Sequence, residues 1–385
     1  MAGEVRRTRG GVAGLVAVLA LAGASVASPA AAGGGAGHGG TQKAMDAAVR
    51  AGVPGVAAQV KDASSLWFGG SGVGNTKTGQ PRSAVDRYRI GSMTKTFVAT
   101  VLLQLEAEKK LSLDDTVEKW LPGVVSGNGN DGSRITVGQL LNHTSGLFNY
   151  VTDPEFLEHG FSTEFLVHRY DTYTLGQLAG IAMKHQPLFA PGAGWSYSNT
   201  NYILAGMIIE KVTGRTYAQE IDRRVIKPLG LYATSVPGTS TAVPQPSSRA
   251  YSKLSLTPQP SDPVHDITEL NPSAAGPAGA MISDSGDLNR FTSALLGGKL
   301  LPAAQLKEMT TTVPVSGAPF TGYGLGLMKF ELSCGTTVWG HGGNIQGSTS
   351  DAVTTADGKH SLAFNFNGDW AGDVQSVVEA EYCPG

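Results

Sequence analysis

Apolar side chains repeat with two different periods along this chain, and the alternation outlines its elements. Near the N-terminus the pattern predicts a helix at 41–51 and strands at 55–60, 66–70 and 88–90. The last strand runs into a predicted helix whose apolar face comprises Phe97, Val98, Val101, Leu102 and Leu105. The first hundred residues therefore combine strands and helices.

The middle of the chain is mainly helical in pattern. Segments with helical spacing lie at 137–141, 174–185, 201–213 and 219–226, and loops rich in glycine and proline separate them. Residues 237–263 hold many Pro, Ser and Thr residues, so we expect them to cross the surface as an irregular loop.

The last third returns to strands. A predicted helix at 285–296 precedes strand-like stretches at 322–328, 336–339, 349–355 and 360–366. Asp357-Gly358 marks a hairpin turn between the last two strands, and a helix is predicted at 374–382.

Strands at both chain ends and helices between them predict an α/β (α+β) fold. We expect an antiparallel sheet flanked by helices, with a large all-helical insertion. The predicted sheet domain is 41–110 plus 276–385, and the predicted helical domain is 111–275.

The first 32 residues have the pattern of a secretory signal peptide. Arg6, Arg7 and Arg9 precede an uncharged apolar stretch at 10–27, and Ala30-Ala31-Ala32 offers a cleavage site, with 25–27 as an alternative. We expect residues 33–40 to form a flexible, glycine-rich leader. The mature protein is thus expected to be secreted into the extracellular space, away from any membrane, where a disulfide persists.

Composition and charge exclude several functions. Lys and Arg number 29 against 31 Asp and Glu, a net charge of -2, so no basic excess favours nucleic acid as a partner. No histidine lies at metal-ligand spacing with a cysteine or another histidine, so we expect no metal and no cofactor. The two cysteines, Cys334 and Cys383, close a loop of about 50 residues if they pair, which is worth about 4 kcal/mol.

The strongest candidate for chemistry is Gly91-Ser92-Met93-Thr94-Lys95. Ser92 lies where a strand gives way to a helix, and residues three apart share a helix face, so the Lys95 ammonium can reach the Ser92 hydroxyl. The helix N-terminus supplies free N–H groups for a developing oxyanion, and a desolvated lysine can act as the base. The alternative is an N-cap serine with a solvated lysine.

Two further motifs carry candidate functional residues: one lies just before a predicted helix, and the other contains two glycines. Tyr197 could pass protons and Asn199 could hold a substrate amide, although both also suit purely structural roles. His341-Gly342-Gly343 follows a β-rich stretch, where glycines permit a ligand backbone to approach closely.

These three motifs, spaced by 105 and 144 residues, resemble those of the penicillin-recognising serine hydrolases. That superfamily contains class C β-lactamases, DD-peptidases and related esterases. The runs RYRIGSMTKTF, ITVGQLLNHTSGL, PGAGWSYSNTNYILAGMIIEKVTG, AGAMIS and YGLGL are also similar to it. The chain looks most like secreted actinomycete D-alanyl-D-alanine carboxypeptidases, so the expected fold is β-lactamase/DD-peptidase-like.

The resemblance implies a role for each motif. Ser92 would be the acylated nucleophile, Lys95 its activating partner, and Tyr197 the proton shuttle, assisted by His341. Asn199 would bind the acyl-side amide, and Gly342 and Gly343 would line the substrate strand. The backbone N–H groups of Ser92 and Asn344 would form the oxyanion hole. The resemblance also implies a Cys334–Cys383 disulfide and a loop-ordering role for Asn142-His143.

Three departures from the carboxypeptidase pattern concern the substrate. Gly342 and Asn344 stand where those relatives have Thr, and Met328 stands where they have Arg; these groups help hold the terminal carboxylate there. Lys329 could replace that Arg only if the strand were shifted.

We therefore expect a monomeric D-alanyl-D-alanine carboxypeptidase-like peptidase that binds penicillin and acts on a peptidoglycan-derived peptide. The alternatives are an esterase or another D-amino-acid peptidase of the same family, a less favoured β-lactamase, and a binding module with little turnover.

Overall fold

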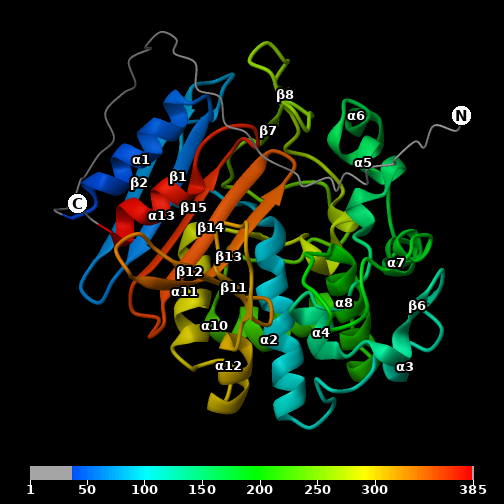
Figure 1. Ribbon diagram of the computed structural model, residues 1–385. Coiled ribbons are helices and arrows are strands. Elements are labelled where there is room, and N and C mark those ends of the chain that lie inside the picture. Colours follow the sequence, from blue (N-terminus) through cyan, green and yellow to red (C-terminus); the bar gives the residue numbers. More distant parts are fainter. Residues whose placement is uncertain (1–36, 384–385) are drawn as a thin grey trace, which may run out of the picture.

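A computed structural model describes residues 37–383 of this chain, and its centre is one antiparallel sheet (Figure 1). From edge to edge the strands are β10 (Val313–Pro314), β11 (Gly322–Tyr323), β12 (Met328–Glu331), β13 (Thr337–Ile345), β14 (Ser348–Thr355), β15 (Ser361–Phe366), β1 (Gly55–Lys61), β2 (Leu66–Asn75) and β3 (Gln80–Pro81). Strands from the two ends of the chain meet where β1 pairs with β15. The short pairs are β4 (Tyr88–Arg89) with β9 (Ile282–Ser283), β5 (Ser126–Gly127) with β6 (Asn130–Asp131), and β7 (Tyr251–Ser252) with β8 (His265–Asp266).

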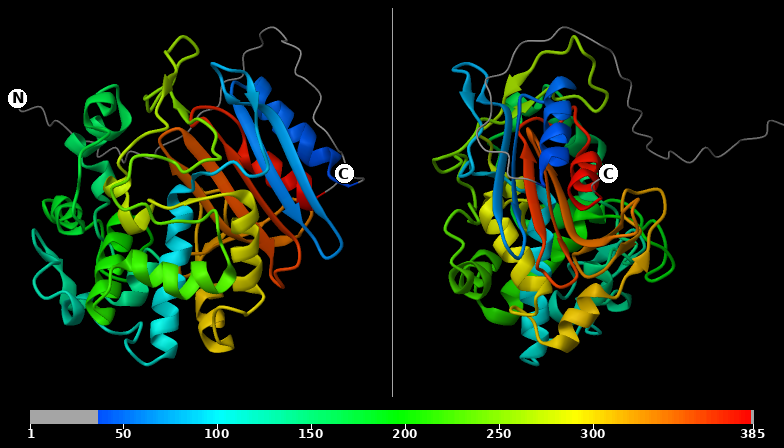
Figure 2. Two further views of the ribbon diagram at one scale, coloured as in Figure 1. Left: turned by 180° about the vertical axis from the view of Figure 1, so that it is seen from behind. Right: turned by 90° about the vertical axis from the view of Figure 1, so that its left-hand side faces the viewer.

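Helices cover both faces of the sheet. On one face α1 (Gly39–Arg50) and α13 (Val374–Tyr382) lie side by side, as the blue and red helices of Figures 1 and 2 show. Their buried residues, such as Met45 and Val377, join one apolar cluster with Phe364 of the sheet. On the other face, α2 (Thr94–Ala107) and α11 (Ser285–Leu296) pack through stacked rings of Phe97 and Phe291, whose centroids are 3.7 Å apart.

The remaining helices form a layer beside the sheet, most of them in the middle of the chain. They are α3 (Val117–Trp120), α4 (Val137–Leu141), α5 (Pro154–Phe161), α6 (Phe165–His168), α7 (Leu175–Met183), α8 (Asn199–Thr213), α9 (Tyr217–Ile221), α10 (Lys227–Leu229) and α12 (Ala303–Thr310). Short 3-10 turns are η1 (Gly91–Met93), η2 (Gly132–Arg134), η3 (Tyr150–Thr152), η5 (Pro272–Ala274) and η6 (Gly276–Ala278), and η4 (Asp222–Ile226) is a π-helical turn. The buried helix α8 packs against α2, α4 and α7.

Local sequence explains why several helices begin and end where they do. The hydroxyls of Thr136, Thr174 and Thr216 each accept a hydrogen bond from the backbone N–H of the Gln three residues on. The side-chain oxygen of that Gln in turn accepts from the backbone N–H of the Thr, so α4, α7 and α9 all start with a capping box. Gly214 ends α8 in the left-handed conformation, with φ of 68°.

The predicted fold class is confirmed, since an antiparallel sheet lies beside a helical region. The helices predicted at 137–141, 285–296 and 374–382 match α4, α11 and α13. The division into a sheet domain and a helical domain stays a prediction.

Several predicted boundaries are wrong. The strand predicted at 322–328 is interrupted, because Gly326 turns the chain with φ of 69° and a Cβ at Gly324 would lie 2.0 Å from the carbonyl oxygen of Met309. Strand β13 continues to Ile345, beyond the predicted end at Trp339, because its glycines allow neighbouring backbone to approach closely.

Two predictions concern the N-terminal residues, most of which lie outside the region that the structure describes. The predicted leader should extend to residue 40, but α1 already begins at Gly39. The signal peptide at 1–32 lies outside the described residues. Within residues 37–383, no helix combines the length and the apolar character that a membrane span requires.

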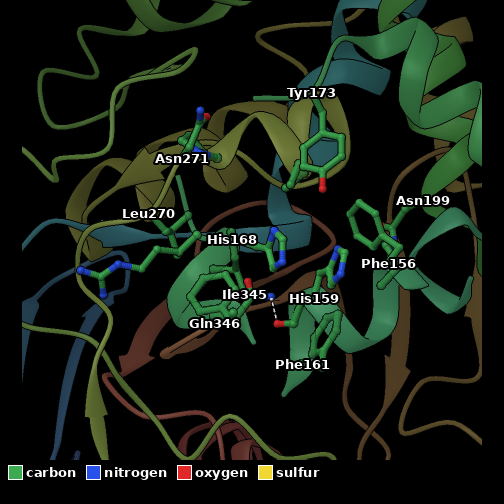
Figure 3. A pocket seen from close by; sticks show the side chains of 18 of the residues that line it. Phe156, His159, Phe161, His168, Tyr173, Asn199, Leu270, Asn271, Ile345 and Gln346 are labelled. Atoms are coloured by element: carbon green, nitrogen blue, oxygen red, sulfur yellow. Dashed lines mark hydrogen bonds between the residues drawn. The ribbon is translucent and has the colours of Figure 1, made fainter. Parts of the chain in front are cut away.

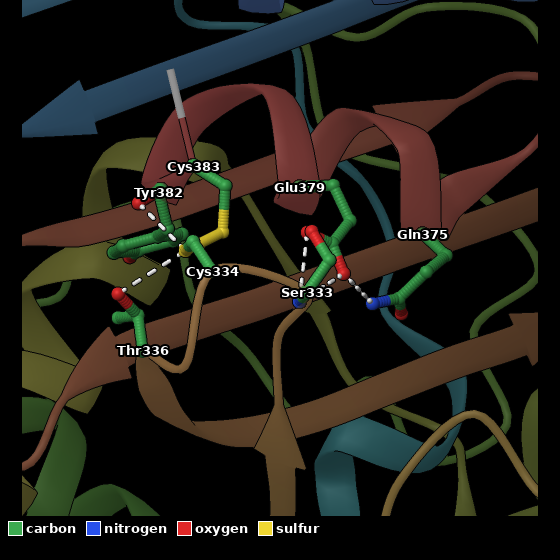
Figure 4. Close-up of a disulfide and its surroundings, with 7 residues drawn as sticks. All are labelled: Ser333, Cys334, Thr336, Gln375, Glu379, Tyr382 and Cys383. Carbon is green, nitrogen blue, oxygen red and sulfur yellow. Dashed lines mark hydrogen bonds between the residues drawn. A yellow bond between two sulfur atoms is a disulfide. The ribbon is translucent and has the colours of Figure 1, made fainter. Parts of the chain in front are cut away.

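Two sets of contacts fix helix α13, near the C-terminus, to the rest of the chain. The disulfide between Cys334, in the turn after β12, and Cys383, after α13, has the pairing that the resemblance implies (Figure 4). Glu381 of α13 receives hydrogen bonds from Thr41 at 2.6 Å and from His360 at 2.8 Å, and His38 lies 3.1 Å away. Both contacts hold α13 on the sheet.

Candidate active site

Ser92 lies in a tight turn between β4 and α2. Gly91 adopts a φ of 50°, and a Cβ there would lie 2.7 Å from the backbone nitrogen of Asn344, so glycine is required. The hydroxyl of Thr94 donates to the carbonyl of Gly91 at 2.8 Å and accepts from the N–H of Met281 at 3.1 Å. This turn fixes Ser92 beside β13, at the start of a helix as the sequence predicts.

Lys95 lies one helical turn after Ser92 and is completely buried. Its Nζ lies 2.9 Å from the Oγ of Ser92, 2.8 Å from the Oδ1 of Asn199 and 2.7 Å from the carbonyl oxygen of Ala278. Burial lowers the pKa of Lys95 well below its ordinary value. A neutral amine has two hydrogens for the two carbonyl-type acceptors, which leaves its lone pair for the Ser92 hydroxyl. The geometry therefore suits a general base.

Tyr197 lies on the other side of this pair. The Nζ of Lys95 is 4.8 Å from the centroid of the Tyr197 ring. Burial raises the pKa of the Tyr197 phenol, and a hydrogen bond with Ser92 offsets part of this rise. The structure thus brings Ser92, Lys95, Tyr197 and Asn199 together, from α8, α2 and the connecting turns.

His341 lies close to Tyr323, while its expected role in assisting Tyr197 stays a prediction. Its ring centroid is 6.3 Å from that of Tyr197, whereas its Nε2 lies 2.9 Å from the hydroxyl of Tyr323. That hydroxyl also lies 3.2 Å from the Nε2 of His143, which is fully buried. Tyr323 therefore connects two histidines. Sequence reasoning missed this role, and the only signal was a tyrosine in an apolar run.

The hydrogen bonds fix the direction of this chain of polar groups. The Nδ1 of His143 accepts from the backbone N–H of Ser198 at 3.2 Å, so its Nε2 carries the proton and donates to Tyr323. Tyr323 then donates to the Nε2 of His341, whose Nδ1 donates to the carbonyl of Gly342 at 2.5 Å. Burial lowers the pKa of His341 to about 3 and that of His143 also falls, so both rings are neutral.

The third motif lies on an open strand edge. Strand β12 pairs with β13 only through residues 337–340, so no strand within residues 37–383 pairs with residues 341–345 on that side. A Cβ at Gly343 would lie 1.9 Å from the carbonyl oxygen of Ile90, which shows how closely β13 approaches the Ser92 turn. A Cβ on Gly91, the residue before Ser92, would lie 2.7 Å from the backbone nitrogen of Asn344, while the oxyanion hole formed by Ser92 and Asn344 stays a prediction. The ammonium of Lys329 forms an ion pair with Glu331 at 2.7 Å, so it does not point toward the open edge of β13.

An aromatic pocket opens beside Ser92 and Asn199 (Figure 3). Its apolar lining includes Tyr150, Val151, Phe156, Phe161, Phe165 and Tyr173. The imidazoles of His159 and His168 stack 3.8 Å apart at its wall. The Nε2 of Gln346 donates to the carbonyl of Gly160 at 2.7 Å, which ties the end of α5 to the end of β13. No sequence motif indicated this pocket, because its lining comes from separate segments.

Among residues 37–383, no group of three or more His, Cys, Asp or Glu side chains is arranged to hold a metal ion.

Comparison with known proteins agrees with this geometry. The family model described as Beta-lactamase matches residues 41–374. The structure of a D-stereospecific amidohydrolase from Streptomyces sp. is 60% identical with a TM-score of 0.86, covering 90% of this chain and 99% of that chain. The D-amino acid amidase from Ochrobactrum anthropi SV3, solved with D-phenylalanine, is 29% identical with a TM-score of 0.76, covering 89% and 97%.

More distant relatives include penicillin-binding proteins. Penicillin-binding protein 4* of Bacillus subtilis (strain 168) is 25% identical over 295 residues, which are 75% of this chain and 62% of that protein. This chain therefore spans less than two thirds of that relative's length. Because the family model covers most of the sequence and the structural likeness extends along nearly the whole chain, this protein belongs to the β-lactamase family of serine hydrolases.

Proposed function

We propose that this chain is a D-stereospecific amidohydrolase that cleaves the amide bond of D-aminoacyl amides through an acyl-enzyme on Ser92. The observation that carries the proposal is the aromatic pocket, which opens beside Ser92 and Asn199 on the acyl side of the nucleophile. The likeness to the Streptomyces amidohydrolase, at 60% identity, supports the D-stereochemistry.

The first half of the reaction is acylation. Neutral Lys95 takes the proton of the Ser92 hydroxyl, which lies 2.9 Å away, and Oγ attacks the substrate carbonyl carbon. The backbone N–H groups of Ser92 and Asn344 hold the oxyanion, and Asn199 holds the acyl part of the substrate. Tyr197 passes the proton taken by Lys95 on to the leaving nitrogen, so the C–N bond breaks and ammonia or an amine departs.

The second half is hydrolysis of the ester on Ser92. A water molecule loses a proton to the Lys95–Tyr197 pair and attacks the same carbon. The ester bond breaks, Ser92 regains its proton, and the free D-amino acid leaves. The same acylation step on a β-lactam would open its ring and leave an adduct on Ser92.

The size of the pocket favours large apolar side chains over the methyl group of D-alanine. A phenyl ring in contact with Phe156 and Phe161 would leave water entirely, and burial of an aromatic side chain contributes about 1.5–3 kcal/mol. A methyl group leaves most of the aromatic lining uncovered. We therefore place D-phenylalanine amide ahead of the D-alanyl-D-alanine peptide that the sequence suggested.

The test compares D-phenylalanine amide, its L enantiomer, a D-Ala-D-Ala peptide and a nitrophenyl ester on purified protein. We expect the D-amide to be hydrolysed at least ~100-fold faster than the L-amide. Ser92→Ala should abolish turnover and remove the benzylpenicillin adduct seen by mass spectrometry, whereas Ser133→Ala, at an exposed serine, should change neither. A higher kcat/KM for the D-Ala-D-Ala peptide than for the D-amide would refute the proposal.

We also propose that the protein is secreted. The disulfide between Cys334 and Cys383 supports this, because disulfides persist in oxidising compartments. Amino-terminal sequencing of protein from the culture medium should show cleavage near Ala32, and intact protein confined to the cytoplasm would contradict it.

A further inference from the structure

A buried carboxyl group lies directly beneath the third motif. Asp351 of β14 is opposite Gly342 of β13 in the sheet register. A Cβ built on Gly342 would lie only 2.8 Å from the Oδ1 of Asp351. The carboxyl therefore fills the place that a side chain at position 342 would occupy. Because residue 342 is glycine, no side chain separates the Asp351 carboxyl from the substrate side of the strand.

This carboxyl lacks the partners that a buried acid normally has. Asp351 is 6% exposed, and its Oδ1 is buried without a hydrogen-bond donor anywhere in residues 37–383. Burial raises the pKa of Asp351 to about 7. A buried polar group without a hydrogen-bond partner lowers the stability of the fold. Its presence next to the strand expected to bind substrate therefore suggests that Asp351 has a role in function.

The position of the pocket shows which part of a substrate would meet Asp351. Residues 344–346 of the chain line the aromatic pocket, so the acyl side chain lies at that end of β13. With the carbonyl carbon at Ser92, the leaving group must extend toward Gly342, on the side of Tyr197 and His341. Asp351 thus lies on the leaving-group side.

Among residues 37–383, no basic side chain neutralises Asp351 on the leaving-group side of the site. Lys329, the basic residue in the adjacent part of β12, is paired with Glu331, and Lys95 is held by Ser92, Asn199 and Ala278. Within the described chain no Lys, Arg or His forms an ion pair with Asp351. Across the backbone of Gly342, the Asp351 carboxylate would attract a leaving group that carries N–H donors or a positive charge, whereas a free carboxylate there would face a second anion.

From this arrangement we infer that Asp351 determines leaving-group specificity: the site takes amides whose leaving group is neutral or cationic and disfavours those that end in a free carboxylate. The inference rests on the proposed amidohydrolase function. It makes Asp351 a specificity-determining residue, while Ser92, Lys95 and Tyr197 perform the chemistry.

The test uses two dipeptides that differ only in charge, D-Phe-D-Ala and D-Phe-D-Ala amide, at about pH 8, where Asp351 is ionised. We expect wild-type kcat/KM to favour the dipeptide amide by ~10-fold or more, because the free acid sets two like charges near each other. Asp351→Asn should reduce this preference to ~3-fold or less, mainly by improving hydrolysis of the free acid. Asp114→Asn removes an exposed carboxylate after α2 and should keep the wild-type ratio.

Each outcome supports or overturns the inference. Equal cleavage of the two dipeptides by the wild type overturns it, and so does an unchanged ratio in Asp351→Asn. Asp351→Ser provides a smaller second variant, and circular dichroism confirms that each variant is folded. Hydrolysis of D-phenylalanine amide is measured in parallel: if the wild type does not cleave it, the proposed function fails, whereas normal cleavage with an unaltered dipeptide ratio refutes only the role of Asp351.

Discussion

Replacing Tyr323 by Phe removes one hydroxyl from the centre of the buried histidine chain. That hydroxyl accepts from His143 at 3.2 Å and donates to His341 at 2.9 Å. The phenyl ring keeps the packing of Tyr323, which is fully buried. The substitution therefore leaves two ring nitrogens without this partner, and it also removes the hydrogen bond between the phenols of Tyr323 and Tyr202.

The expected loss of stability follows from these two nitrogens. Leaving a buried polar group unsatisfied costs about 1–3 kcal/mol, so two of them predict a loss of about 2–6 kcal/mol in the free energy of unfolding. We also expect a lower kcat, because the loss of Tyr323 frees His341 to turn at the edge of the substrate strand.

Urea unfolding followed by tryptophan fluorescence measures the change. Tyr232→Phe is the control, since Tyr232 is 90% exposed and its substitution should change stability by less than about 0.5 kcal/mol. A loss below about 1 kcal/mol in Tyr323→Phe would show that water or another donor replaces the hydroxyl, and the argument for a fixed chain of hydrogen bonds would fail.

Three further predictions follow from other contacts. Lys95→Arg should slow acylation by about 10²–10⁴-fold, because an arginine stays protonated, whereas burial lowers the lysine pKa; wild-type acylation should rise with pH through that lowered pKa and then level off. Cys334→Ser with Cys383→Ser should cost about 4 kcal/mol of stability, measured by thermal unfolding, with kcat unchanged. Glu381→Gln should destabilise the protein at neutral pH. Burial alone would raise the pKa of Glu381, but the hydrogen bonds to it lower the pKa, so the carboxylate stabilises the fold above its unfolded pKa and this stabilisation disappears in acid.

Each of these has a control and a contrary result. Lys299→Arg, at an exposed lysine, should leave acylation intact, and comparable rates in the two arginine variants would contradict a neutral-lysine mechanism. The serine double variant should have the same melting temperature with and without reductant, whereas the wild type should lose stability when reduced. A stability difference between Glu381→Gln and wild type that is constant from neutral to acid pH would exclude the ionised carboxylate as its cause.

The sequence predicted the parts of the site whose geometry is local. Ser92 and Lys95 share one helical turn, so their contact follows from spacing alone. Helices α11 and α13 were predicted from the sequence pattern alone, and the structure adds that Asp284 and Asp373 cap them. The alternation of residues 349–355 and 360–366 around one turn likewise defined the β14–β15 hairpin.

Other parts depend on contacts between distant segments. His143 and Tyr323 are separated by 180 residues, and neither belongs to a motif with a stated chemical role. The aromatic pocket draws on α5, α6 and the turns around them, and only the folded chain brings these side chains together. Asp351 is an ordinary acidic residue in the sequence, and its position beneath Gly342 depends on the register of two strands.

The pairing of β1 with β15 has a consequence for how the chain is made. Lys61 and Ser361 are opposite each other across 300 residues. At about 5–20 residues per second, a ribosome needs about 15–60 s to add the second strand after the first. The centre of the sheet cannot close during that interval, so β1 waits for almost the entire chain to be synthesised. A chain that postpones its own folding in this way is well suited to the proposed export, since it can be threaded across a membrane before the sheet forms.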